Sequence, residues 1–140
     1  MKVLVDTSVW SLVLRRGPEL GSAHSQEMQD LIAGHRVQMI GPIRQELLSG
    51  IRDDAQFNSL AKHLAAFPDL PLLTDDYVTA ARFYNLCRRQ GVQGSNTDFL
   101  ICAVSARHRL TIYTTDQDFL LFATHLPIEL HKPQRTSPVA

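Results

Sequence analysis

Four acidic residues stand at widely separated points of the 140-residue chain, where their carboxylates could do chemistry together. They are Asp6 in VLVDTS, Glu46 in IRQELL, Asp98 in SNTDFL and Asp116 in YTTDQD. If they gathered, any two carboxylates about 4 Å apart would repel by about 4 kcal/mol at an effective dielectric of 20. A hard divalent cation relieves such repulsion, and an all-oxygen ligand set without Cys or His predicts Mg²⁺ or Mn²⁺ rather than zinc.

The spacing of apolar residues predicts the elements that would bring these acids together. Short apolar runs predict strands at residues 3–5, 37–40, 110–114 and around 127–130, with a short extended segment at 70–73. Helical spacing predicts helices at residues 7–16, 22–33, 43–54, 55–67, 77–90, 97–109 and 116–126. Gly17-Pro18 is expected to end the first helix, and Asp75-Asp76 to cap the fifth.

Strands that alternate with helices favour a short, mainly parallel sheet between helical layers, a three-layer α/β/α sandwich. The loops at the carboxyl ends of parallel strands converge on one crevice, where open α/β sheets bind their ligands. Asp6 and Asp116 directly follow predicted strands, Glu46 lies early in the helix after a strand, and Asp98 begins a helix. The architecture therefore predicts that the four acids meet.

Length and composition favour one domain without a membrane anchor. We expect residues 1–131 to form it and residues 132–140 to be a flexible tail, because HKPQRTSPVA is poor in apolar residues. No apolar stretch approaches the roughly 20 residues that span a bilayer, and a secretory signal is absent, so we expect a cytoplasmic protein. Cys87 and Cys102 lie in apolar helical patterns typical of core packing. The six histidines show no metal-binding spacing and are expected at the surface or at helix ends.

Each acid also has an ordinary structural explanation. Asp98 and Asp116 could stabilise helix starts, and Glu46 could face solvent on its helix. Asp6 is harder to explain in this way, because a carboxylate at the end of a buried strand needs partners, although capping the next helix would supply some. The joint placement of all four favours a shared site.

Four motifs, taken in order and at their spacings, resemble the PIN-domain ribonucleases, and within them the VapC-type toxins of bacterial toxin–antitoxin pairs. The motifs are VLVDTSVW at 3–10, GPIRQELLSG at 41–50, NTDFLICAVSARH at 96–108 and LTIYTTDQDF at 110–119. The resemblance covers residues 2 to about 130 and implies a PIN-like fold. It also implies metal-dependent hydrolysis of RNA phosphodiester bonds.

The same resemblance assigns roles to individual residues. It implies that Asp6, Glu46, Asp98 and Asp116 form the catalytic metal site with Mg²⁺ or Mn²⁺. Glu46 could bind the metal, bind its water or act as general base. The groups expected to support the site are Thr7, Ser8, Asn96, Thr114 and the ambiguous second acid of the last motif, Asp118.

The resemblance further implies partners: an RNA substrate, a cognate VapB-type antitoxin and a second copy of the chain in a homodimer. The 14 basic and 14 acidic residues balance, but drawing four acids into one site leaves 10, so the exterior would be mildly positive. Arg44, Arg52 and Arg15 are the candidates for contacts with the RNA backbone.

Two other classes of protein compete with this interpretation. A phosphoaspartyl protein would also place an acid at a strand end, but it requires a late lysine near the site, and Lys132 in the tail is the sole candidate. A noncatalytic RNA-binding or protein-binding α/β module remains open. It predicts that the acids only cap helices and that divalent ions do not change stability.

Overall fold

The central sheet consists of four parallel strands in the order β2-β1-β3-β4. The strands are β1 (Val3–Val5), β2 (Val37–Gln38), β3 (Thr111–Tyr113) and β4 (Glu129–Leu130). The chain crosses from β1 to β2 on one side, and later elements build β3 and β4 on the other side. The carboxyl ends of β1 and β3 therefore lie next to each other at the point where the strand order reverses, which is where open α/β sheets bind ligands.

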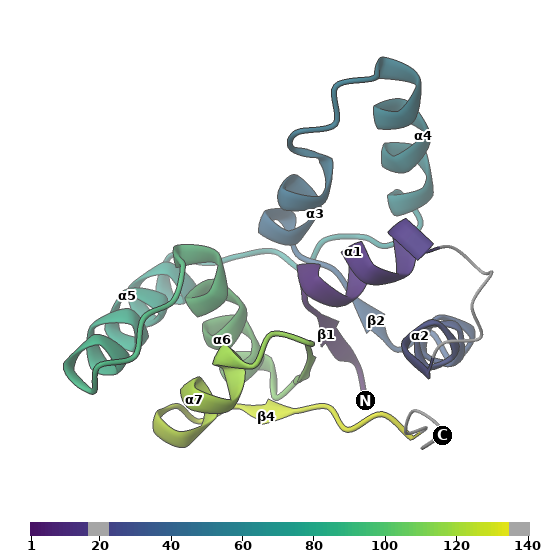
Figure 1. Ribbon diagram of the computed structural model, residues 1–140. Coiled ribbons are helices and arrows are strands. Elements are labelled where there is room, and N and C mark those ends of the chain that lie inside the picture. The colour runs from purple at the N-terminus through teal and green to yellow at the C-terminus, as the bar shows by residue number, and fades with distance from the viewer. Residues whose placement is uncertain (17–22, 135–140) are drawn as a thin grey trace.

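The computed structural model describes residues 1–16 and 23–134. Its helices are α1 (Thr7–Arg16), α2 (Ala23–Ala33), α3 (Gly41–Leu48), α4 (Asp54–Leu64), α5 (Thr74–Arg89), α6 (Asn96–His108) and α7 (Asp118–His125). Figure 1 shows α5, α6 and α7 grouped on one side of β1, with α1 to α4 on the other. The predicted α/β fold with a short parallel sheet between helices is confirmed.

The core forms around β1, whose three residues are completely buried. A strand buried on both faces needs an unbroken apolar run, and VLV supplies one. Cys87 and Cys102 are buried and unpaired, as predicted, and burial raises the pKa of both thiols. None of the described helices is both long enough and apolar enough to span a membrane.

Several elements are shorter than predicted, for local reasons. The helix predicted for residues 43–54 ends at Leu48, because Gly50 has a φ of 88° and Asp53 starts the next helix by accepting a hydrogen bond from the Gln56 amide. The strand predicted at 37–40 ends at Gln38, beyond which Met39 makes an isolated bridge to Asp69.

The segment at 70–73 does not form a strand. Pro68 and Pro71 lack amide hydrogens and interrupt any ladder, so Leu70 makes a single backbone bond to Met39. The fifth helix begins at Thr74 rather than 77, and the Asp76 carboxylate accepts a bond from the Leu73 amide.

A buried Glu27 connects α2 to the segment after β4, which the sequence did not predict. Its carboxylate accepts hydrogen bonds from the His131 Nε2 (2.6 Å) and the Gln134 amide (3.1 Å). Nearby, His24 Nδ1 lies 2.6 Å from the Tyr113 hydroxyl. The expectation of a surface or helix-end position is therefore wrong for His131, because it pairs with a buried acid.

The predicted tail boundary at 131/132 stays a prediction. The described part, up to residue 134, is joined to α2 by the Gln134 bond, and residues 135–140 lie outside the described part of the chain. Gly17-Pro18, predicted to end the first helix, and Ser22, predicted to begin the second, also lie outside it.

Candidate active site

Asp6 lies at the carboxyl end of β1 with only 5% of its surface exposed. Its backbone amide donates to the Tyr113 carbonyl at 2.8 Å, which continues the pairing of β1 with β3. Its Oδ2 accepts hydrogen bonds from the Ser8 and Thr114 hydroxyls, both at 2.8 Å. Two neighbouring strand ends therefore fix this carboxylate through the hydroxyls of Ser8 and Thr114.

Asp116 follows β3 in a tight turn before α7. Its amide donates to the Thr114 hydroxyl at 3.0 Å, and its Oδ1 accepts from the Asp118 amide at 2.9 Å. Because that turn occupies residues 116 and 117, α7 starts at Asp118 instead of at residue 116. The carboxylate of Asp118 is itself exposed, and its backbone amide is the group that orients Asp116.

Asp98 lies in the first turn of α6 and forms a capping box with Ser95. The Asp98 amide donates to the Ser95 hydroxyl at 3.1 Å, and the Ser95 amide donates to Asp98 Oδ2 at 3.0 Å. Burial raises the pKa of the Asp98 carboxyl, and the negative charges of Asp6 and Asp116 raise it further, against the two bonds from Ser95. Asp6 and Asp116, from two other segments of the chain, therefore lie close enough to act electrostatically on Asp98.

Glu46 stands on α3 at the exposed edge of this group. Its Oε1 accepts a hydrogen bond from the Thr7 hydroxyl at 2.7 Å. Since Thr7 directly follows Asp6, this bond joins α3 to the end of β1. A polar pocket of about 520 Å³ opens beside Glu46, between α3 and the starts of α1 and α6.

The four carboxylates share one feature: a single oxygen is held by the chain. The held oxygens are Asp6 Oδ2, Glu46 Oε1, Asp98 Oδ2 and Asp116 Oδ1. Within the described residues the other oxygen of each accepts no hydrogen bond from the chain. Each side chain is therefore oriented through one oxygen, and its other oxygen makes no hydrogen bond with the described residues.

The donor set fits a hard divalent cation. It offers carboxylate oxygens only, and Asp98 is held near like charges that a cation would neutralise. Across residues 1–16 and 23–134, no group of three or more Asp, Glu, His or Cys side chains is placed so that it could hold a metal ion. Mg²⁺ commonly takes one or two carboxylates and keeps several waters, so a complete protein ligand set is not required.

A model of the PIN domain family matches residues 3–124. The chain belongs to the PIN domain family. It is 34% identical to the VapC ribonuclease Mb1587 of Mycobacterium bovis over 125 residues, which is 86% of this chain and 91% of that protein. The resemblance inferred from the four motifs is confirmed.

Two solved structures share the PIN fold with this chain. FitAcB from Neisseria gonorrhoeae has a TM-score of 0.74 at 20% identity, over 96% of this chain and 99% of that one. VapBC2 from Rickettsia felis, bound to a DNA fragment from its promoter, has a TM-score of 0.75 at 15% identity, over 94% and 98% of the two chains.

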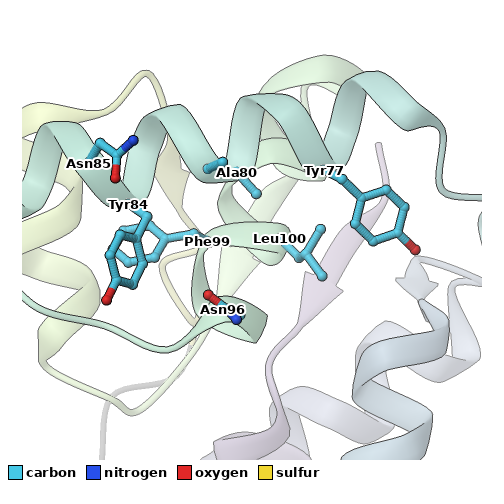
Figure 2. A pocket seen from close by; sticks show the side chains of 8 residues that line it. Tyr77, Ala80, Tyr84, Asn85, Asn96, Phe99 and Leu100 are labelled. Carbon is cyan, nitrogen blue, oxygen red and sulfur yellow. The ribbon is translucent and has the colours of Figure 1, made fainter.

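Asn96 was expected to support the site acids, but its side chain points elsewhere. Residues two positions apart on a helix point in widely different directions, so Asn96 and Asp98 cannot share a face of α6. The Asn96 side chain instead lines a groove between α5 and α6 with Tyr84 and Phe99 (Figure 2). The residue that supports Asp98 is Ser95, and the S-x-x-D spacing of a capping box would have identified it.

Gly94 lies where the loop before α6 passes close to two aromatic rings. A side chain at Gly94 would place its Cβ 2.5 Å from the ring of Phe122 and 3.1 Å from that of Phe99. Glycine therefore lets the loop pass over the aromatic core on its way to Ser95 and Asp98.

The three candidate arginines differ in their surroundings. Arg44 forms an ion pair with Asp69 at 2.9 Å and donates to the carbonyls of Leu64 and Phe67, so it fastens α3 to the end of α4. This structural role competes with the RNA contact predicted for it. Arg52 is exposed, and the side chain of Arg15 lies outside the described part of the structure.

The raised pKa of Asp98 predicts a stability change in the metal-free protein. An acid whose pKa is raised by folding destabilises the folded state above that pKa, and the penalty disappears as pH falls below it. Asp98→Asn keeps an acceptor for the Ser95 amide and should raise the melting temperature at pH 7 by about 2–5 °C. Thermal unfolding in EDTA checks this, and the gain should shrink as the pH falls toward 3.8 and below. A lower melting temperature for Asp98→Asn at pH 7 would contradict the repulsion.

Proposed function

We propose that this PIN domain is a Mg²⁺- or Mn²⁺-dependent endoribonuclease toxin. The proposal is supported by the position of Asp6 and Asp116 after the neighbouring strands β1 and β3 and by the electrostatic effect of both on Asp98, each with one carboxylate oxygen that accepts no hydrogen bond from the described residues. RNA as substrate is supported by the 34% identity to a relative named a VapC ribonuclease. An RNA substrate in turn implies a cytoplasmic location.

The acids have separable roles in this mechanism. Asp6, Asp98 and Asp116 would hold the divalent ion, which when bound acidifies a water and draws charge from the scissile phosphate. Ser8 and Thr114 keep Asp6 oriented through their hydrogen bonds. Glu46, held through Oε1 by Thr7, would accept the proton of the attacking water on Oε2.

The test is cleavage of RNA by the purified chain with Mg²⁺ or Mn²⁺ and with EDTA, followed by sequencing of the 5′ ends of the fragments. We expect internal cuts at defined positions that require the ion. Equal cleavage in EDTA would refute metal dependence, and absence of cuts with either ion would refute the ribonuclease proposal.

We also propose that a VapB-type antitoxin docks on the side formed by α1 and α4. Leu14, Ile51 and Leu60 line a groove of about 530 Å³ there, and the exposed Phe57 lies on the same helix α4. An amphipathic segment of the antitoxin would bury these apolar groups. Leu47 of α3 is buried in the core and does not line this groove. Addition of the antitoxin should suppress the RNA cleavage described above.

A second copy of the chain is proposed to cover the α5–α6 groove. Figure 2 shows Tyr77 and Tyr84 of α5 and Phe99 of α6 around this groove, whose volume is about 460 Å³. Tyr77 is 52% exposed, and the neighbouring Val78 is 44% exposed. A homodimer through this face would bury apolar surface that is costly to leave in water.

The dimer proposal predicts an effect of Tyr77→Glu. The wild-type chain should sediment as a dimer at micromolar concentration, and Tyr77→Glu should shift it to a monomer, because the new charge would be buried without a partner. Arg82→Glu, an exposed change on the same helix outside the groove lining, is the matched control. A wild-type monomer, or a Tyr77→Glu dimer of unchanged stability, would refute this face as the interface.

A further inference from the structure

The polar pocket beside Glu46 has no role in the mechanism above. It has a volume of about 520 Å³, within the range of small-ligand sites. Its lining residues come from the starts of α1 and α6 and from α3: Thr7, Pro42, Gln45, Glu46, Ser49 and Thr97. Because Glu46 and Thr7 belong to the candidate active site, whatever fills this pocket lies next to that site.

The pocket has hydrogen-bonding capacity that the chain does not use. The Ser49 hydroxyl donates to the backbone carbonyl of Gln45 at 2.7 Å, one turn back on the same helix. By contrast, the Gln45 side-chain amide and the Thr97 hydroxyl have no hydrogen-bond partner among the described residues. An exposed glutamine offers a donor and an acceptor side by side.

The charge of the pocket decides which part of an RNA it can hold. Among the described residues that line it, Glu46 alone is charged. A phosphate would be repelled there, since none of the described lining residues is a Lys or Arg that could compensate for that carboxylate. The pocket therefore suits an uncharged group with polar edges, and Pro42 adds an apolar surface for its face. A nucleobase meets this description.

We propose that this pocket binds the base of the nucleotide next to the scissile phosphate and that Gln45 selects the base. The inference rests on the proposed ribonuclease function and deepens it. Single-stranded RNA is recognised by hydrogen bonds to exposed base edges, and a glutamine amide can pair with two adjacent edge atoms. Thr97 supplies one further hydrogen bond. Gln45 and Thr97 are thus specificity-determining residues.

The experiment compares cleavage profiles on a pool of short single-stranded RNAs randomised at every position. The wild type should prefer one base at one position beside the cut. Gln45→Leu, which keeps the size of the side chain, should reduce that preference by about tenfold while preferences elsewhere remain. Thr97→Val should reduce the base preference at the same position by a smaller factor. Gln29→Leu, an exposed glutamine of α2, is the matched control and should leave the profile unchanged.

An unchanged profile in both Gln45→Leu and Thr97→Val would overturn the inference while leaving the ribonuclease function intact. If the wild type does not cleave RNA at all, the proposed function fails instead. In that case, NMR tests base binding separately. The resonance of the Gln45 side-chain amide is followed on addition of short RNAs that differ at one base. A base-dependent shift supports base binding there, and its absence refutes it.

Discussion

Asp6→Asn is expected to lower the rate of RNA cleavage by at least about a hundredfold. Asp6 is the most buried of the four acids, and its Oδ1 is free to bind an ion while Oδ2 is held by Ser8 and Thr114. An amide has the same shape and can still accept both hydroxyl bonds, but it carries no charge. Single-turnover cleavage of one RNA at saturating Mg²⁺ measures the loss.

The fold should survive this substitution. Removing one of several like charges relieves repulsion, so metal-free Asp6→Asn should melt at the wild-type temperature or above it. Asp75→Asn, an exposed acid in the first turn of α5, is the matched control and should keep full cleavage. Unfolding of Asp6→Asn would show that Asp6 is a structural residue, and retained cleavage would remove it from the mechanism.

Asp76→Asn is expected to produce the largest loss of stability, with a drop in melting temperature of about 10 °C. The Asp76 carboxylate is 1% exposed and joins α5 to α6 by accepting from Arg107 Nε at 2.6 Å and Nη2 at 2.8 Å. It also accepts from the Leu73 amide at 2.8 Å. The asparagine keeps an acceptor for Leu73 but leaves the Arg107 guanidinium without its counter-charge.

The effect of Asp76 should depend on pH in a defined direction. Its hydrogen bonds from Arg107 lower the pKa of the carboxyl below the ordinary value of 3.8, in spite of its burial. The stabilisation is therefore complete above that ordinary value and is lost as the pH falls through the lowered pKa. Melting temperatures from pH 7 to pH 2 should converge for wild type and Asp76→Asn at the acid end. Equal melting temperatures at pH 7 would contradict the role of the pair.

The sequence was sufficient for the order of elements and for the candidate acids. Residues 3–5 form a buried apolar run that can only be a central strand, and an acid at the end of such a strand faces the crevice. Asp116 could be placed beside Asp6 because parallel strands put their carboxyl ends at one edge, whereas Asp98 opens a helix that follows another helix. This argument uses local pattern and topology and needs no side-chain geometry.

What the sequence missed depends on contacts between distant residues or on rotation around a helix. The partner of Glu27 is 104 residues away in His131, and the partner of Arg107 is 31 residues away in Asp76. Arg44 was a candidate for RNA contact because it lies on the helix that carries Glu46. In the structure it forms an ion pair with Asp69, which lies after α4. The resemblance implied a supporting role for Asn96, but its side chain lines the groove between α5 and α6.

The central claim, that Asp6, Asp98 and Asp116 together bind a divalent ion, is tested most directly by thermal unfolding of the RNA-free protein with Mn²⁺ and with EDTA. At about ten times the dissociation constant, Mn²⁺ should raise the melting temperature of the wild type by roughly 3–6 °C, and EDTA should reverse the rise. Asp6→Asn should show little or no rise. An unchanged wild-type melting temperature at millimolar Mn²⁺ would contradict the claim and favour a noncatalytic module in which the acids only cap helices.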